Sequence, residues 1–363
     1  MNRRTLLTGA GSAVAAAGIG FGAIICGEGS MADYDAAAAQ SRTPLIAEPG
    51  HAPLIRAATL AANGHNAQPW RFRTEARTIA ILPDFARRTP VVDPDDHHLY
   101  VSLGCAAENL VLAARASGRP GDLGSTGDGP ALRYDFTLGR AEPSPLHGAI
   151  TRRQSTRALY DGRAVPPGDL ARLDAAGTAP EVNLVLLTER ARIDPVRDLV
   201  LAGNRVQMQD QAFMRELKAW LRFNPRAALR HRDGLFSRTS GNPVLPTWLG
   251  GPAVDLLLSA DAENATYAQQ IPSSAGLAVF FGDRADPAHW IAVGRACQRF
   301  ALTATSLGLK HAFLNQPVEV AFLRAELAKC VGAAGHRPDI VMRFGYGPDR
   351  PFSLRRPVAA VLA

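Results

Sequence analysis

The sequence predicts an α+β protein whose single chain carries two related halves, packed about a pseudo-twofold axis. After residue 40, helix-like patterns alternate with short apolar strands. Two stretches, from Gly104 to Gly118 and from Gly294 to Gly308, have the same length and place an apolar residue, a Leu and an Ala at the same offsets. This spacing is typical of a buried helix closed by a C-terminal glycine. A duplicated supersecondary unit is one explanation of the match, and a chance similarity is the other.

The composition favours a folded protein with a substantial core and disfavours a nucleic-acid-binding one. Hydrophobic residues make up 47% of the 363 residues, which argues against wholesale disorder. The formal net charge is +7, but the basic residues are scattered as single arginines and short pairs, without a basic–aromatic stripe. We therefore expect no nucleic-acid partner.

The cysteines and histidines indicate neither a disulfide framework nor a metal site. The cysteines form no CxxC pair, and Cys105 and Cys297 sit in apolar helical patterns that are typical of buried thiols. His97 and His98 follow two aspartates. Because adjacent residues of a strand face opposite ways, we do not expect these two rings to bind one metal ion.

Residues 1–40 have the layout of a targeting segment followed by a linker. Arg3 and Arg4 precede an apolar, Ala/Gly-rich run from Gly9 to Cys26, which is typical of a twin-arginine signal. We expect the twin-arginine export machinery as a partner and a periplasmic location. The alternative is an uncleaved anchor, because about 20 apolar residues can span a bilayer. That anchor would hold the protein on the outer face of the membrane.

The predicted strands are short apolar runs bounded by polar or glycine-rich residues. They comprise residues 78–82, 132–138, 182–187, 276–281 and 339–344. Polar, Gly/Pro-rich stretches at 118–130 and 142–145 are typical of linkers.

An alternating basic motif in the middle of the chain suggests an anion site. Arg153, Ser155 and Arg157 are each separated by one residue, so in an extended loop all three side chains face the same way. Two guanidinium groups held together favour an anion between them, and arginine suits bidentate contacts with phosphate. The alternative is a solvated basic loop.

A second polar cluster lies upstream, just before a stiff strand that begins at Trp70. Asn63, Gly64, Asn66 and Gln68 offer uncharged donors and acceptors and a close backbone approach. Such groups in an apolar setting suit a planar heteroaromatic ring. The alternative is an ordinary helix-to-strand turn with a buried Trp.

Both clusters resemble motifs of one family. Asn66-x-Gln68-Pro69-Trp70 resembles the N-x-Q-P-W signature of the nitroreductase family. The segment from Arg153 to Arg157 resembles the R-x-S-x-R/K phosphate motif of the same family. The likeness covers residues 50–360, roughly the whole chain after its N-terminal segment.

The order of the two motifs is reversed, because in ordinary members the arginine motif comes first. The reversed order resembles the Acg-like branch, in which one chain carries two nitroreductase-like halves. The resemblance implies a nitroreductase-like fold, with an N-terminal half at 41–140, a C-terminal half at 141–363 and one FMN bound between them. It also implies that only one of two ancestral flavin sites persists.

The resemblance assigns roles around the flavin. The FMN phosphate would contact the arginine motif and a late basic pair, and the isoalloxazine ring would contact the loop before Trp70 and the loop after Gly308. The expected cofactor-binding residues are Arg153, Gln154, Ser155, Arg157, Asn63, Gly64, Asn66, Gln68, Leu314, Asn315, Arg355 and Arg356. The resemblance singles out no catalytic residue.

Two departures from the family pattern bear on the chemistry. Many relatives place a lysine near flavin N1/O2, where a positive charge stabilises the reduced ring. Here no lysine lies between Lys218 and Lys310, and Gln270 is the nearest polar candidate. The insertion-like stretch 205–260 resembles a lid over the flavin in the Acg-like branch. The alternative is a surface helical excursion packed on the core.

Two functions follow from the resemblance. The first is an FMN-dependent oxidoreductase that passes electrons from a reduced donor, such as NAD(P)H, to an electron-poor small molecule. The second is a non-catalytic protein that binds or sequesters flavin in an occluded site. Because fold alone does not fix function, both remain open at the level of sequence.

Overall fold

The structure is a computed structural model that describes residues 28–44, 50–125 and 131–363. The twin-arginine motif and the apolar run that follows it lie outside the described residues, as does the end of the linker expected at 118–130. The described chain is an α+β fold, as expected, with two separate four-stranded antiparallel sheets.

The first sheet belongs to the N-terminal part of the chain. Its strand order is β1-β2-β4-β3, from β1 (Trp70–Glu75), β2 (Thr78–Pro83), β4 (Leu132–Phe136) and β3 (Gly121–Ser125). Part of the linker expected at 118–130 is instead the edge strand β3, because residues 121–125 pair with β4. A side chain at Gly121 would meet the Asp135 carbonyl oxygen at 2.0 Å, so only glycine permits this pairing.

The second sheet is built by the C-terminal part. Its order is β5-β8-β10-β9, from β5 (Val182–Leu187), β8 (Gly276–Gly282), β10 (Pro338–Gly345) and β9 (Lys310–Phe313). Strands β8 and β10 are buried at every position, which is typical of a central strand covered on both faces. The short edge strand β9 carries Lys310 and His311, and its sequence gave no strand signal.

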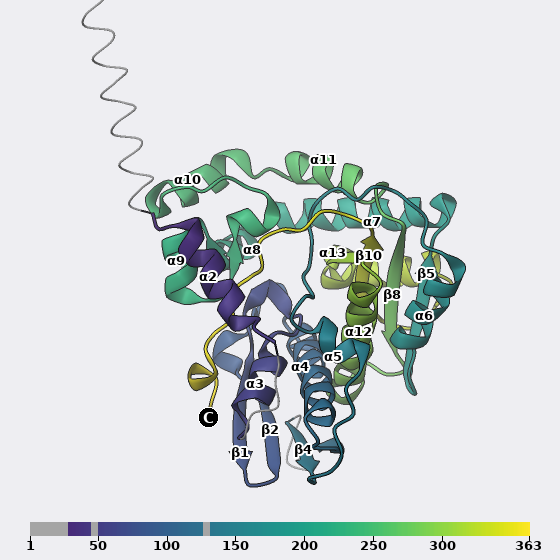
Figure 1. The fold of residues 1–363 in the computed structure, drawn as a ribbon. Helices are drawn as coiled ribbons and strands as arrows, with labels where there is room; N and C mark the ends of the chain where they lie inside the picture. Colours follow the sequence, from purple (N-terminus) through teal and green to yellow (C-terminus); the bar gives the residue numbers. More distant parts are fainter. Residues whose placement is uncertain (1–27, 45–49, 126–130) are drawn as a thin grey trace, which may run out of the picture.

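Helices α4 (His97–Ala116) and α12 (Pro287–Ser306) pack against each other between the two sheets (Figure 1). They contain the two matching stretches, and both end at a glycine with positive φ, Gly118 at 71° and Gly308 at 75°. Their backbones meet at the first glycine of each stretch. A side chain on Gly104 would lie 2.1 Å from the Ile291 carbonyl oxygen, and one on Gly294 would lie 2.0 Å from that of Val101.

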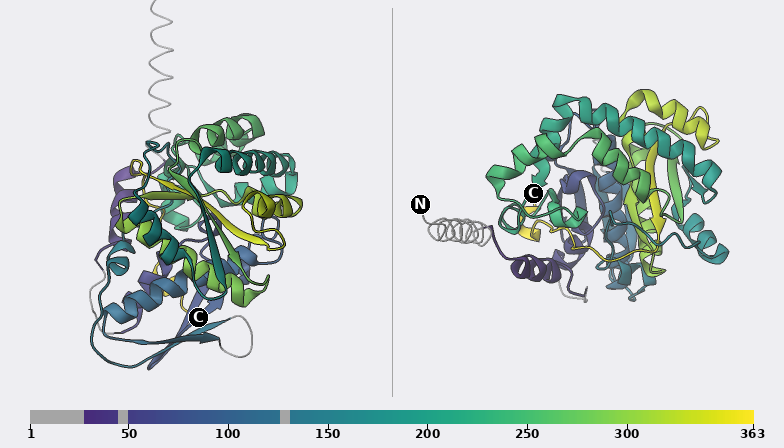
Figure 2. Two further views of the ribbon diagram at one scale, coloured as in Figure 1. Left: turned by 90° about the vertical axis from the view of Figure 1, so that its right-hand side faces the viewer. Right: turned by 90° about the horizontal axis from the view of Figure 1, so that it is seen from above.

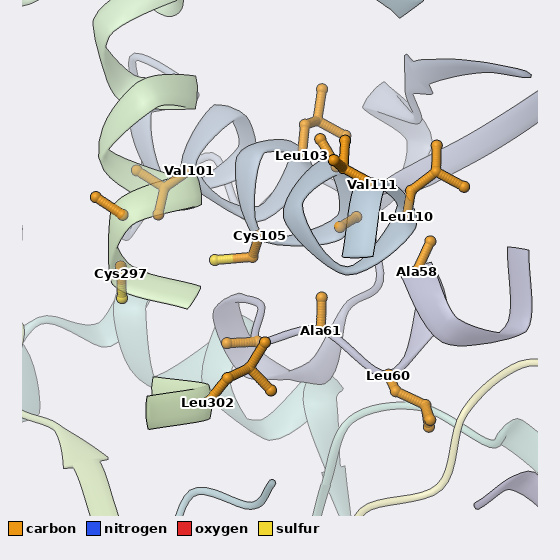
Figure 3. Close-up of a cluster of buried hydrophobic side chains, with 14 of the residues drawn as sticks. Ala58, Leu60, Ala61, Val101, Leu103, Cys105, Leu110, Val111, Cys297 and Leu302 are labelled. Carbon is orange, nitrogen blue, oxygen red and sulfur yellow. The ribbon is translucent and has the colours of Figure 1, made fainter. Parts of the chain in front are cut away.

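The seam between α4 and α12 is apolar at its centre and polar at its edges. Figure 3 shows Cys105 of α4 near Cys297 of α12 among alanine and leucine side chains. Both thiols are buried, and Cys105 Sγ donates to the Gly294 carbonyl oxygen at 3.2 Å. Glu108, also buried, forms ion pairs with Arg295 and Arg299 across the seam.

A further set of helices lies across one end of the molecule, at the top of Figure 1. It comprises α7 (Arg190–Gln209), α8 (Gln211–Trp220), α9 (Pro225–His231), α10 (Thr247–Leu257) and α11 (Ala260–Gln270), with the two-stranded pair β6 (Leu221–Arg222) and β7 (Leu235–Phe236). The insertion-like stretch 205–260 therefore contains the end of α7, the helices α8, α9 and α10, and the strands β6 and β7.

The remaining helices are shorter than α4 and α12. They are α2 (Met31–Ser41), α3 (Ala52–Thr59), α5 (Pro145–Ala149), α6 (Pro167–Gly177), α13 (Gln316–Glu319) and α14 (Arg324–Cys330). Among them, α3 packs its buried side chains on α4. Short 3₁₀ turns lie at Gly64–Asn66, Phe85–Arg87, Ser237–Ser240, Ala321–Leu323 and Val358–Ala360. None of the helices in the described part of the chain has both the length and the apolar character of a membrane span.

The C-terminal tail links the two sheets. After β10 it crosses to the first sheet, as both views of Figure 2 show. There Phe72 of β1 donates its N–H to the Val361 carbonyl oxygen, and Ala363 donates its own to the Phe72 carbonyl oxygen. Residues 361–363 thus pair with β1 of the first sheet.

The glycine contact in the seam gives a first prediction. The Gly294→Ala substitution adds a methyl group at the Val101 carbonyl oxygen, so the helices must separate, and we expect a loss of about 2–3 kcal/mol in the free energy of unfolding. Gly168→Ala in α6 is the matched control, because nothing lies within 4 Å of its added Cβ. Chemical denaturation measures both. An unchanged Gly294→Ala variant would show that the helices do not touch there.

Candidate functional site

A cavity of about 510 Å³ lies beneath the helices at the end of the molecule. One wall comes from the N-terminal part of the chain, through the loop at residues 62–65 and the first two turns of α4. The opposite wall comes from the C-terminal part, through Arg157, Gln270 and residues 313–319. The cavity is therefore shared by both parts of the chain.

The side of the cavity formed by residues 205–260 is mainly apolar. This roof comprises Met208, Phe213, Leu217, Leu221, Phe223, Leu235, Phe236, Leu245, Ala253, Val254 and Leu258. Most of the polar lining side chains come from other segments, but Gln207, Ser237, Ser240 and Asn242 belong to this stretch as well, so the cavity has a mainly apolar side with a few hydrogen-bonding groups at it. Such a lining is common in sites that bind a planar organic ligand.

The loop at residues 63–68 is a tight left-handed turn, with φ of 48° at His65, 52° at Asn66 and 55° at Gln68. Asn63 Oδ1 accepts the Gln68 N–H at 2.8 Å and closes the turn. Asn63 and Gly64 line the cavity, as expected. Asn66 and Gln68 do not, because the turn directs their side chains to the outside of the loop.

Asn66 and Gln68 tie the loop to its neighbours. Asn66 Nδ2 donates to the carbonyl oxygens of Gly234 and Leu354, at 3.1 and 3.2 Å. Gln68 Nε2 donates to the Arg232 carbonyl oxygen, and Gln68 Oε1 accepts the Arg356 N–H, both at 2.8 Å. These two amides hold the cavity loop against residues 232–234 and the C-terminal tail, and their expected contact with a ligand stays a prediction.

The late basic pair also supports the loop instead of lining the cavity. Arg355 is buried and donates to the Thr59 carbonyl oxygen at 2.7 Å and to Asn66 Oδ1 at 2.8 Å. Burial lowers its pKa to about 9. Arg356 reaches Asp84 and the Ala360 carbonyl oxygen. Neither arginine lines the cavity, and the expected contact of this pair with the FMN phosphate stays a prediction.

The alternating motif does not form one shared anion site. Arg153 is only 2% exposed and donates to the Leu60 carbonyl oxygen at the end of α3, at 2.9 Å. A helix C-terminus attracts a cation, which accounts for this position. Arg157 faces the other way, lines the cavity and donates to Ser240 Oγ at 3.2 Å.

The two residues between these arginines fix the local backbone. Ser155 is exposed and forms a parallel bridge with His311 of β9. Gln154 Nε2 donates to the Arg350 carbonyl oxygen, and its Oε1 accepts the Arg350 N–H. Neither lines the cavity, so Arg157 is the residue of this motif that does.

Of the two residues expected to bind the cofactor in the loop after β9, one lines the cavity and the other is buried in a hydrophobic core cluster. Asn315 lines the cavity, and its Oδ1 accepts the Val341 N–H at 3.0 Å. Leu314 is 1% exposed and belongs to a core cluster on the other side of the sheet. Gln270, the nearest polar candidate for the missing lysine, also lines the cavity and donates to the Arg157 carbonyl oxygen.

Sequence analysis missed a pair of titratable groups in the cavity wall. His98 Nε2 lies 3.5 Å from Glu319 Oε1, and Gln207 Nε2 donates to Glu319 Oε2 at 2.6 Å. His98 lies in the first turn of α4, where the Asp93 carboxylate accepts its N–H. His98 and Glu319 are far apart in the sequence, so no local pattern predicts that they meet. The one local signal is Asp93, which precedes the helix and accepts the His98 N–H.

The neighbouring His97 points away from the cavity. Its Nε2 lies 2.9 Å from Asp339 Oδ1, and both side chains are almost completely buried. Burial raises the pKa of Asp339 to about 6 and lowers that of His97 to about 3. Within the described residues no group of three His, Cys, Asp or Glu side chains could hold a metal ion.

Burial shifts the pKa of four titratable groups in the cavity wall in the direction that disfavours the charged form. It lowers the pKa of His65 to about 4 and that of His98 to about 3. It raises the pKa of Glu263 and of Glu319. Near neutral pH, both imidazoles are therefore uncharged.

The histidine in the left-handed turn gives a second prediction. Burial, with Arg157 and His98 nearby, holds the pKa of His65 at about 4 against a usual 6.5. Its contribution to stability is thus present above pH 6.5 and lost as the pH falls towards 4. His65→Asn keeps a residue that tolerates positive φ. We expect the variant and the wild type to have the same free energy of unfolding at pH 8. By pH 4 the variant should have lost about 2 kcal/mol less of it than the wild type.

Flavin-free protein unfolded in urea at several pH values measures this difference. His336→Asn is the control, since that side chain is at the surface and away from the cavity. Parallel stability curves for the wild type and His65→Asn would contradict the buried, neutral state of His65.

Comparisons with known proteins extend over most of the chain. No protein-family model matches it. Two curated proteins of Mycobacterium tuberculosis, from strains CDC 1551 and H37Rv, are each 27% identical over 306 residues, which cover 81% of this chain and 84% of the relative. Both carry the name "Putative NAD(P)H nitroreductase".

Solved structures give a weaker likeness. A nitroreductase with bound FMN from Desulfitobacterium hafniense has a TM-score of 0.39 at 15% identity, covering 59% of this chain and 96% of its own. The FMN-dependent nitroreductase NfnB of Mycobacterium smegmatis, in complex with NADPH, has a TM-score of 0.37 at 16% identity, covering 56% and 88%. Scores below 0.5 add nothing to the argument. The two curated relatives, in contrast, show that most of the chain is similar to proteins that carry the nitroreductase name.

Proposed function

We propose that the chain is an oxidoreductase that binds one FMN in the cavity and passes electrons through it to an electron-poor small molecule. One observation carries the proposal: a single cavity is lined by Asn63, Gly64, Arg157 and Asn315, which come from three segments far apart in the sequence. Each belongs to a motif that resembles a flavin-contacting motif. The names of the two curated relatives support the same activity and NAD(P)H as the donor.

The cavity residues fit the parts of FMN. Arg157, with the hydroxyl groups of Ser237 and Ser240, offers one charged and two neutral donors for a phosphate. The backbone of Asn63 and Gly64 and the loop at Asn315 would border the ring, beneath the apolar roof. Bound FMN would supply the two-electron chemistry, and the protein would orient it and exclude water.

The chain's own residues also offer a proton beside the ring. His98 and Glu319 lie 3.5 Å apart in the same cavity, and Gln207 fixes the glutamate. Reduction of an acceptor needs protons as well as electrons. In this proposal the pair holds one proton and donates it to the acceptor.

We further propose that the fold is a tandem pseudo-dimer of the Acg-like kind. Three observations support it: the two four-stranded sheets, the two glycine-closed helices that meet at equivalent glycines, and a cavity shared by both parts. Residues 205–260 would act as a lid over the flavin, since they form its apolar roof. The sequence Arg3-Arg4 supports export by the twin-arginine route to the periplasmic side.

The second candidate is a protein that binds flavin without turnover. The roof favours it, because eleven apolar side chains from residues 208–258 line one side of the cavity and restrict entry. The described lining also contains no lysine, and its one guanidinium is that of Arg157.

The phosphate assignment gives a third prediction. Arg157→Ala removes a charge-assisted hydrogen bond of about 1.5–3 kcal/mol, so the dissociation constant for FMN should rise about 10- to 100-fold. Quenching of flavin fluorescence on binding measures it. Arg152→Ala is the matched control, since Arg152 is exposed, lies next to the same motif and does not line the cavity. Equal affinities for the two variants would refute the assignment.

Anaerobic reduction separates the two candidate functions. We expect NAD(P)H to bleach the absorbance of bound FMN, and a quinone or nitroaromatic compound to restore it over repeated cycles. Reduction by dithionite alone would favour the flavin-binding candidate. Preparations that stay colourless after incubation with excess FMN would exclude both.

A further inference from the structure

Helix α10 presents two different apolar faces. Gly250, Ala253 and Val254 line the cavity on its inner side. Trp248, Pro252 and Leu256, spaced four residues apart, are exposed on its outer side. Trp248 is 69% exposed and Leu256 is 82% exposed. One helix therefore separates the cavity from an apolar stripe on the surface.

The stripe differs from the other exposed apolar residues of the described chain. Leu138 and Phe322 are similarly exposed, at 71% and 70%, but each stands alone, and single exposed hydrophobic residues are common. An indole beside aliphatic side chains on one helix face is typical of elements that lie at a membrane interface, where Trp prefers the headgroup level.

Exposed arginines lie on α9 beside the stripe, together with exposed carboxylates at Asp255 of α10 and at Asp33 and Asp35 of the neighbouring α2. Within residues 221–258 the two carboxylates are both in ion pairs, Asp233 with Arg222 and Arg87, and Asp255 with Lys218. The adjoining helix α9 exposes Arg226 and Arg230. This charge complements the anionic headgroups of a phospholipid bilayer, where each basic residue near the surface contributes about 1 kcal/mol.

Helices α9 and α10 form one continuous surface. Asn224, the N-cap of α9, donates through Nδ2 to Thr247 Oγ1 and to the Leu245 carbonyl oxygen, both at 3.0 Å. This amide fixes the start of α10 against the start of α9. Figure 1 shows both helices at the same corner of the molecule, next to α2.

The described chain begins at this corner. The Glu28 carbonyl oxygen accepts the Arg226 N–H at 2.8 Å, and Gly29 is so close to Arg226 that an added Cβ would lie 2.7 Å from its nitrogen. The sequence before Glu28 contains the apolar run from Gly9 to Cys26. Any membrane attachment through that run would therefore bring α9 and α10 to the bilayer surface.

We propose that the α9–α10 surface docks on an anionic phospholipid membrane, with Trp248 and Leu256 at the headgroup–acyl boundary and the α9 arginines on the phosphates. The occupant of the stripe is thus lipid, not a protein partner. The docked helix is also the roof of the cavity, so the membrane covers the molecule at the side of the site. This inference does not depend on the identity of the ligand in the cavity.

Depth-dependent quenching of tryptophan emission tests the proposal. The full chain is bound to phosphatidylcholine–phosphatidylglycerol vesicles, with or without acyl chains brominated near the headgroup. Trp70 and Trp290 are buried, at 0% and 6% exposure, and Trp220 is partly buried, so Trp248 is the indole that lipid can reach. We expect brominated lipid to reduce the emission, and Trp248→Phe to abolish that reduction.

A matched control moves the indole to another exposed position. In a Trp248→Phe, Phe322→Trp double variant, the new indole lies in the turn between α13 and α14. We expect no quenching there. Emission of the wild type that is unaffected by bromine would overturn the proposal, and so would equal quenching in the double variant. A full chain that does not associate with these vesicles would overturn it as well.

Discussion

The backbone contact between α4 and α12 is the constraint on which the other features of the fold depend. Because Gly104 and Gly294 bring the two helices within van der Waals contact, groups on both can form short polar contacts across the seam. Gln298 Nε2 donates to Asn109 Oδ1 at 2.8 Å, and Gln298 Oε1 accepts the Ala62 N–H at 3.3 Å. The seam thereby positions the loop that lines the cavity.

Buried arginines provide the second level of support. Arg153, Arg343 and Arg355 are 0–6% exposed and donate mainly to backbone carbonyl oxygens. Burial lowers the pKa of each of them. Each joins segments that are distant in the sequence, as when Arg343 reaches the Ala158 carbonyl oxygen at 2.8 Å. They fix loops around the cavity and do not enter it.

The local sequence pattern predicted those helices and strands whose own residues show a clear hydrophobic periodicity. Residues 182–187 form β5 as expected, and the two matching stretches form helices with the same glycine end. Two of the edge strands, β3 and β9, were not predicted, because β3 is rich in glycine and β9 is only four residues long. Their pairing partners, not their own residues, decide their structure.

The candidate site was predictable to the extent that its motifs act locally. Asn63, Gly64, Arg157 and Asn315 line the cavity, whereas Arg153 and Asn66 belong to the same motifs and turn elsewhere. In a regular strand, sequence spacing predicts which side chains face the same way. Residues 153–157 form only a single bridge and no regular strand, so their alternating spacing does not predict where the side chains point. His98 and Glu319 meet through tertiary packing alone, which no local pattern reveals.

The charges of the cavity explain why one residue matters so much to the proposed function. His65 and His98 are neutral near pH 7, because burial lowers both pKa values. Burial also favours the protonated forms of Glu263 and Glu319. Among the described lining residues, Arg157 is then the one permanent cation. Its side chain is exposed, so water screens part of its attraction for an anion, and in the proposed function it would hold the phosphate of the cofactor mainly through charge-assisted hydrogen bonds.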